Sequence, residues 1–175
     1  MRELKRDTAV TADILLSQVD HVTGLARNAA RITAGMADRP CADILEKITA
    51  TGAFTPYIRS TGLIRDDALV CSSVTGARIQ DVRQEYGSYL DARTEDGKIF
   101  TLPGTFSVPG QEAIIYASRA DNGMTAFSVV DARYFIDLME SLDDENHAIF
   151  YLQFSSGPAI SSPDRAGRHT SAFRT

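Results

Sequence analysis

The chain has 175 residues, of which 43% are hydrophobic and 23% are charged, so it is long enough for one domain with a core of its own. A formal net charge of -5 and a pI near 5.1 argue against a nucleic-acid partner, which would favour a basic face. No apolar run approaches the roughly 20 residues that cross a bilayer. Composition therefore leaves two expectations open: a cytoplasmic protein, or an extracytoplasmic domain without its flanking membrane helices.

A long helix is predicted over residues 7–34. Its apolar residues recur at alternating spacings of three and four, which is an a/d stripe. The stripe consists of Ala12, Leu15, Val19, Val22, Ala26 and Ala29, and a second row consists of Ile14, Leu25 and Ile32. Two roles are open for the stripe: packing on the helix's own domain, or forming the seam of a homodimer.

A second, short helix is predicted to begin near Pro40 and to stop at Thr51–Gly52. This prediction places Cys41 in the first turn, where unpaired backbone N–H groups and the helix dipole favour a thiolate. We therefore expect Cys41 to be the more reactive of the two cysteines.

The rest of the chain alternates strands with turn residues. Predicted strands cover residues 57–64, 68–73, 88–93, 98–102, 112–118, 124–130 and 148–154, with a helix at 133–141 and a polar tail at 155–175. Consecutive strands joined by tight turns indicate an α+β domain, a long N-terminal helix with a five- to six-stranded antiparallel sheet. The whole chain, 1–175, is expected to form one domain with its core at 38–154, and the order of elements resembles the PAS-like extracytoplasmic sensors called PDC or Cache domains.

The two cysteines, Cys41 and Cys71, are the candidate functional residues. Outside the cytoplasm two cysteines in a small domain would usually pair, whereas in a reducing cytosol they would more often be two buried apolar residues. If they pair, the bond can act as a redox switch or as a permanent staple.

The sequence gives little support for a metal site or for a nucleophilic serine. His21, His147 and His169 are scattered without metal-ligand spacing, so no metal site is expected. Ser72 and Ser73 lack a nucleophile-elbow motif and are interpreted as strand-end residues that satisfy backbone groups or line the bond.

Three further residues are candidates for a ligand pocket beside the sheet. These are Tyr89, Tyr116 and Asp131, which lie on or next to predicted strands. Core packing is the competing role for the two tyrosines.

The segment Val70–Gly76, which contains Cys71-Ser72-Ser73, resembles the CSS-motif sensor domains of bacterial membrane-bound cyclic di-GMP phosphodiesterases of the EAL type. The resemblance extends to a single earlier cysteine after a long helix, here Cys41, and to an extended pair of strands before the motif. It covers residues 8–154.

The resemblance implies a periplasmic domain of an inner-membrane protein, flanked by two membrane helices and followed by a cytoplasmic EAL domain. Cys41 and Cys71 would form a disulfide whose redox state, set by periplasmic thiol–disulfide oxidoreductases, tunes the phosphodiesterase, with the bonded form quiet. The present chain would have no catalysis and no cofactor, while the parent EAL domain would need Mg or Mn. A Cache-type small-molecule sensor with a structural disulfide is the alternative.

Overall fold

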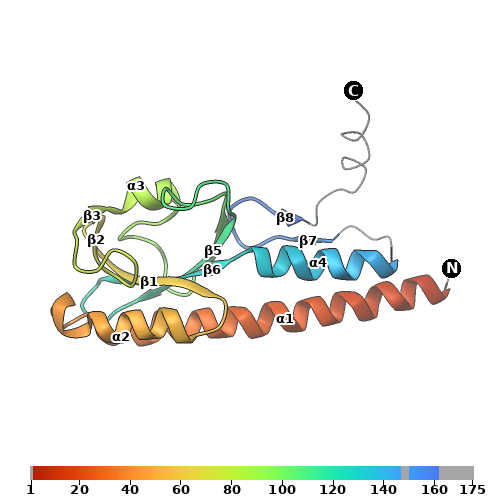
Figure 1. The fold of residues 1–175 in the computed structure, drawn as a ribbon, viewed down its shortest axis with the longest axis horizontal. Helices are drawn as coiled ribbons and strands as arrows, with labels where there is room; N and C mark the ends of the chain where they lie inside the picture. Colours follow the sequence, from red (N-terminus) through yellow and green to blue (C-terminus); the bar gives the residue numbers. More distant parts are fainter. Residues whose placement is uncertain (1, 147–149, 162–175) are drawn as a thin grey trace, which may run out of the picture.

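The structure is a computed structural model that describes residues 2–146 and 150–161. A long helix and a shorter one run along one face of a six-stranded sheet, as Figure 1 shows. The helices are α1 (Arg2–Ala34), α2 (Cys41–Phe54), α3 (Val82–Tyr86) and α4 (Arg133–Asn146), with a 3-10 turn η1 (Gly87–Tyr89). The strands are β1 (Ile58–Arg65), β2 (Ala68–Ser72), β3 (Gln80–Asp81), β4 (Ile99–Leu102), β5 (Ala113–Arg119), β6 (Thr125–Asp131), β7 (Tyr151–Leu152) and β8 (Ile160–Ser161).

The sheet order is β3-β2-β1-β6-β5-β4, and every pairing is antiparallel. The predicted α+β class and the antiparallel sheet behind a long N-terminal helix are thus confirmed. Tight turns explain the local pairings: Asp66 and Asp67, with φ of 48° and 62°, form the two-residue hairpin turn between β1 and β2. Gly123 closes the predicted hairpin between β5 and β6.

Helix α1 lies across β5 and β6, and the predicted a/d stripe faces the sheet. Leu15, Val22, Ala26 and Ala29 are all buried within this one chain, together with Phe135 of α4. The stripe is therefore part of the domain's own core, and a dimer cannot use it without opening the fold. Small side chains at positions 26 and 29 let the helix approach closely, and the Ser128 hydroxyl donates a hydrogen bond to the Ala26 carbonyl at 2.8 Å.

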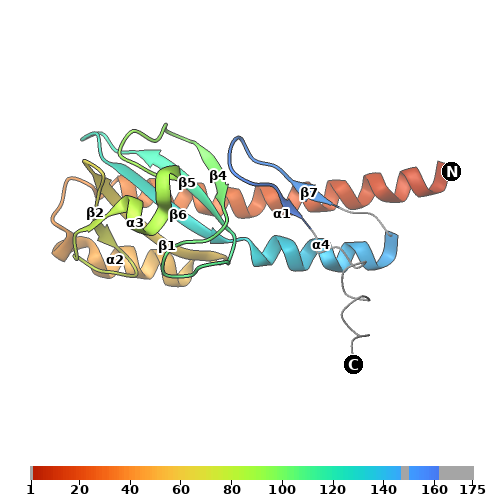
Figure 2. The ribbon, with the colours of Figure 1, turned by 90° about the horizontal axis from the view of Figure 1, so that it is seen from above.

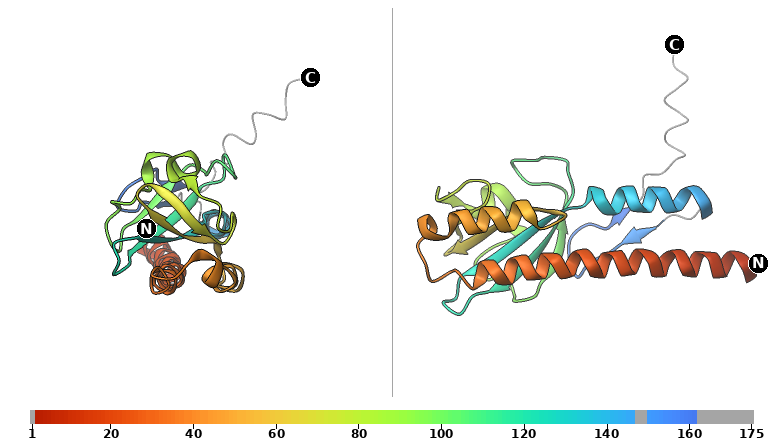
Figure 3. Two further views of the ribbon diagram at one scale, coloured as in Figure 1. Left: turned by 90° about the vertical axis from the view of Figure 1, so that its left-hand side faces the viewer. Right: turned by 60° about the horizontal axis from the view of Figure 1, so that its bottom comes forward.

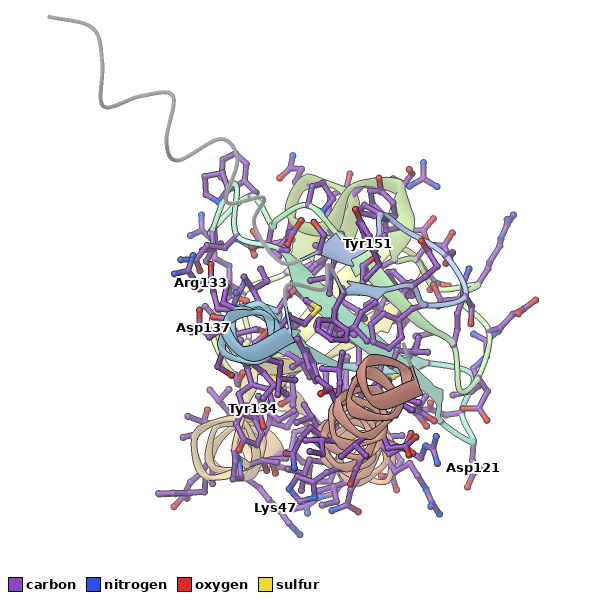
Figure 4. The ribbon with its side chains drawn as sticks, turned by 90° about the vertical axis from the view of Figure 1, so that its right-hand side faces the viewer. Lys47, Asp121, Arg133, Tyr134, Asp137 and Tyr151 are labelled. Atoms are coloured by element: carbon purple, nitrogen blue, oxygen red, sulfur yellow. A yellow bond between two sulfur atoms is a disulfide. The ribbon has the colours of Figure 1, made fainter. Side chains whose placement is uncertain are left out.

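Helix α4 runs beside α1 in the opposite direction, so its C-terminal end and the N-terminal end of α1 lie at the same end of the molecule (Figure 1; Figure 3, right). At the other end of α4, in its first turn, Tyr134 contacts two other segments: its ring lies 4.3 Å from that of Tyr57, between α2 and β1, and its hydroxyl donates to Gln18 of α1 at 2.9 Å. Figure 4 looks along the helices from the end where α1 begins, and it labels Tyr134 beneath α4. Burial and the hydrogen bond with Tyr57 raise the pKa of Tyr134.

Two predicted strands differ from the structure. Residues 88–93 are not a strand, because side chains compete for their backbone groups: the Thr94 hydroxyl accepts from the Asp91 N–H, and the Asp91 carboxylate accepts from the Arg93 N–H. The partner of β4 is instead β5. Of the predicted strand 148–154, residues 148 and 149 lie outside the described residues, and within 150–154 the strand is β7, which pairs with β8.

Helix boundaries also differ from the prediction. The short helix continues through Gly52 to Phe54, and Pro40 is its N-cap rather than its first residue. The long helix begins at Arg2 rather than Asp7. Of the predicted polar tail, residues 162–175 lie outside the described residues, as does His147.

Candidate functional site

Cys41 and Cys71 form a disulfide that joins the first residue of α2 to β2. Their Cα atoms are 5.4 Å apart and their sequence separation is 30 residues. The two ends of the bond differ in access, because Cys71 is 1% exposed while Cys41 is half-buried. Of the two residues, Cys41 is therefore the one nearer to solvent.

A β-bulge decides which way Cys71 points. Leu63 pairs with Cys71 and the next residue, Ile64, pairs with Leu69, so Val70 is the extra residue on β2. Regular alternation would place Cys71 and Leu69 on the same face of the sheet. With the bulge, Leu69 packs with α3 on one face, while Cys71 faces α2 on the other.

The disulfide lies in an apolar cluster that we call the disulfide cluster. Its buried members are Met36, Ala37, Ile44, Ile48, Leu63, Cys71, Ala120, Met124 and Ala126. Two of them, Met36 and Ala37, belong to the connection between α1 and α2. Asn122 of the β5–β6 turn donates to the Ala37 carbonyl at 2.8 Å and holds that connection to the sheet. The bond therefore adjoins the C-terminal end of α1.

Ser73 ties the same segment to both β1 and α2. Its hydroxyl accepts a hydrogen bond from the Thr61 N–H at 3.0 Å, in place of the carbonyl that a longer β2 would offer. Gly52 of α2 packs directly against it: a Cβ at that position would come within 3.2 Å of the Ser73 oxygen. The start of α2 is therefore bonded to β2 through Cys41 and Cys71, and the last part of α2 packs through Gly52 on Ser73, just after β2.

Ser72 points to the other face of the sheet and closes a turn. Its side chain is buried, its hydroxyl accepts from the Val74 N–H at 3.1 Å, and its backbone exchanges two hydrogen bonds with Gly76. Neither serine has a histidine beside it among the described residues, since His21 is exposed on α1. His147 and His169 lie outside the described residues.

The three pocket candidates lie in separate places. Tyr116 of β5 is buried against α1, with the Arg27 guanidinium 5.6 Å from its ring centre. Asp131 ends β6, pairs with Arg59 at 2.9 Å and caps α4 through the Arg133 N–H. Tyr89 is exposed on η1. A pocket shared by all three remains a prediction without support from this arrangement.

Two structural features of the site could not be predicted from the sequence. Gly62 lies beside the cysteine on β1, and a Cβ there would come within 2.8 Å of the Cys71 carbonyl oxygen and 2.7 Å of the Phe127 ring. The bulge at Val70 is the second. Both depend on strand partners distant in the sequence, so no local pattern reports them.

Within residues 2–146 and 150–161, no three His, Cys, Asp or Glu side chains are grouped to hold a metal ion. Among the same residues, no helix combines the length and apolar character that a bilayer crossing requires.

The model of the family described as "CSS motif domain associated with EAL" matches residues 4–174, nearly the whole chain. Among solved structures, the extracellular domain of the histidine kinase rpHK1S-Z16 has a similar fold, with a TM-score of 0.52 and 14% sequence identity. That likeness covers 79% of this chain and 59% of the solved chain, and it concerns the fold alone. No curated protein matches the chain.

Proposed function

Because the chain belongs to the family of CSS motif domains associated with EAL, we propose that it is the periplasmic redox sensor of a membrane-bound cyclic di-GMP phosphodiesterase. The observation that carries the proposal is the disulfide between α2 and β2, one end of which, Cys41, is only half-buried. The catalytic part would be the parent's cytoplasmic EAL domain, with Mg or Mn as its cofactor. The sensor itself performs no hydrolysis.

Reduction would proceed by thiol–disulfide exchange with a periplasmic oxidoreductase. An incoming thiolate attacks the Cys41 sulfur, the bond to Cys71 breaks, and Cys71 leaves with the bonding electron pair and takes up a proton. The oxidoreductase's second thiol then attacks the mixed disulfide and releases Cys41. Two electrons pass to the sensor, and the oxidoreductase finishes as a disulfide.

Helix α1 would pass the conformational change caused by reduction toward the membrane. Breaking the bond loosens α2, whose packing partners include the α1–α2 connection. Since α1 spans from that connection to the opposite end of the molecule, a shift in the population of α2 positions changes the angle or rotation of α1 (Figure 1). Membrane helices flanking the domain in the parent would pass this change to the EAL domain.

The first test is to count free thiols under denaturing conditions, with and without reductant, on protein exported to the periplasm. We expect none before reduction and two after it, at the mass of a single chain. The reduction potential of the pair then separates two roles for the bond: a value within reach of periplasmic thiol exchange supports the switch, whereas one below about -300 mV supports a staple.

A second measurement addresses regulation. In the full-length parent, reduction should raise phosphodiesterase activity, and the Cys41→Ser/Cys71→Ser variant should show the raised activity with or without reductant. Activity that follows reductant equally in this variant would place redox control elsewhere in the parent and overturn the proposal.

A further inference from the structure

Helix α2 lies against β1 and β2 on the face of the sheet that carries the disulfide (Figure 1; Figure 2). Cys71 is 1% exposed, and Ile44 and Ile48 of α2, at 1% and 0%, belong to the same apolar cluster. Leu63 of β1 and Met36 of the α1–α2 connection are further members of it. Because almost no part of Cys71 is open to solvent, a thiolate cannot reach its sulfur while α2 is packed on the sheet.

The other route, attack on the sulfur of Cys41, is opposed at the leaving group. Thiol–disulfide exchange at Cys41 requires Cys71 to leave as a thiolate. Among the described residues no N–H or O–H group donates a hydrogen bond to the Cys71 sulfur, and its polar contact is the Cys41 carbonyl oxygen at 3.9 Å, whose partial negative charge repels a thiolate. An unpaired charge in apolar surroundings is strongly unfavourable. The packed bond therefore resists reduction at either sulfur.

Helix α2 has little stability of its own. It has 14 residues, a length at which isolated helices are marginal in water, and its N-cap Pro40 makes no side-chain cap hydrogen bond. Gly52 weakens it from within, and its last residue, Phe54, is 84% exposed. The helix is therefore held mainly by its packing on the sheet. Strand β1 beneath it pairs with both β2 and β6, so α2 can unfold locally while the sheet stays folded.

We propose that local unfolding of α2 gates reduction of the Cys41–Cys71 bond. In the oxidised protein α2 unwinds over the folded sheet, and water and the reductant then reach the sulfurs. A thiolate of a dithiol attacks the Cys41 sulfur, the S–S bond breaks, and Cys71 leaves with the electron pair and takes up a proton from water. The second thiol of the dithiol then releases Cys41, so two electrons pass to the protein and the dithiol ends as a disulfide.

The stability of α2 would then set how fast the sensor responds, in addition to the reductant. This inference adds a control to the redox role proposed above and rests on that role only for its use in the parent. The reduction rate and the reduction potential are separate measurements. A permanent staple can be gated and a switch can be ungated, so the two proposals can fail independently.

The first test measures reduction of the oxidised chain by excess dithiothreitol in its native state and in guanidinium chloride at the same pH, with free thiols counted at intervals. We expect the native bond to be reduced at least about a hundredfold more slowly than the bond of the unfolded chain, which corresponds to about 2.8 kcal/mol of opening. Equal rates in the two states would show that the reductant reaches the packed bond, and would overturn the gate.

Two isoleucine-to-valine variants identify the element that opens. Ile48→Val removes a buried methyl group between α2 and the sheet, so it should speed native reduction about two- to tenfold. Ile115→Val is the matched control, because Ile115 is 0% exposed on β5 and packs on the other face of the sheet. It should leave the rate within a factor of about two.

Two outcomes of this comparison would overturn α2 as the gate. Equal acceleration by both variants would show that the bond is reached only when the whole domain unfolds. No acceleration by either variant would show that the reductant attacks the packed bond directly.

Discussion

Glycine at position 62 is required because β1 passes directly under an aromatic ring beside the disulfide. A methyl group there would come within 2.7 Å of Phe127 and 2.8 Å of the Cys71 carbonyl oxygen. We expect Gly62→Ala to lower the free energy of unfolding by about 1–3 kcal/mol, the usual cost of overpacking. Chemical denaturation of the oxidised protein measures this change.

The control for that prediction is Gly24, on the exposed side of α1, where an added Cβ meets nothing within 4 Å. Gly24→Ala should raise the free energy of unfolding by about 0.5–1 kcal/mol, because alanine is the better helix former. The same chemical change is thus expected to have opposite effects on stability at the two positions. A neutral effect at position 62 would show that β1 shifts to make room.

The Ser73 side chain contributes to stability through one hydrogen bond to β1, at the point where the regular pairing of β1 with β2 ends. Ser73→Ala removes the acceptor of the Thr61 N–H. The free energy of unfolding should fall by about 1–3 kcal/mol, the cost of an unsatisfied buried donor. Ser88→Ala, at an exposed position on η1, should change it by less than about 0.5 kcal/mol. Comparable losses in both variants would contradict this account of Ser73.

At the level of elements, α2 depends on the disulfide more than any other helix does, because the bond joins its first residue to the sheet. Closing a loop across 30 residues stabilises a fold by about 3–4 kcal/mol on the loop-entropy account. We expect Cys41→Ser/Cys71→Ser to lose that much stability in denaturant unfolding.

Hydrogen exchange gives the sharper measurement. After reduction, amides of α2 should exchange faster, while those of α4, which packs on α1 away from the bond, should keep their rates. Uniform acceleration across both helices would mean that the bond stabilises the domain as a whole rather than α2 in particular.

The elements that could be predicted from the sequence are those specified locally. Local sequence predicts the long helix through its a/d stripe, and it predicts two hairpins through their turn residues, Asp66–Asp67 and Asn122–Gly123. The class of fold follows from these elements. The strand predicted at 88–93 failed because Asp91 and Thr94 hydrogen-bond to nearby backbone instead.

The site was less predictable, for a physical reason. The placement of Cys41 in the first turn of a helix and of Cys71 near the end of a strand was predicted, and the resemblance implied their pairing. The bulge at Val70 and the close contact at Gly52 arise from packing between distant segments. Periodicity and turn residues carry no information about such contacts.

At the scale of the whole molecule, the burial of the a/d stripe leaves a different row of α1 for contact with a second copy. Val10, Ile14 and Ile32 are 53%, 47% and 39% exposed, and Leu25, half-buried, continues the same row. These positions recur at spacings of four, eleven and seven residues, so they form one row along the flank of α1, beside the buried stripe. We expect homodimers to form along this row.

Ile14→Glu tests that expectation, because a charge in the centre of the row would face its symmetry mate. Leu16→Glu is the matched control: Leu16 is 56% exposed but lies about 200° around the helix from Ile14. In sedimentation equilibrium, Ile14→Glu should raise the dimer dissociation constant at least about tenfold, while Leu16→Glu should leave it within a factor of about two, differences of about 1.4 kcal/mol and 0.4 kcal/mol. A wild-type domain that stays monomeric at high concentration, or equal weakening by both variants, would exclude this row as the dimer contact, and the output of the sensor would then have to pass through a single α1.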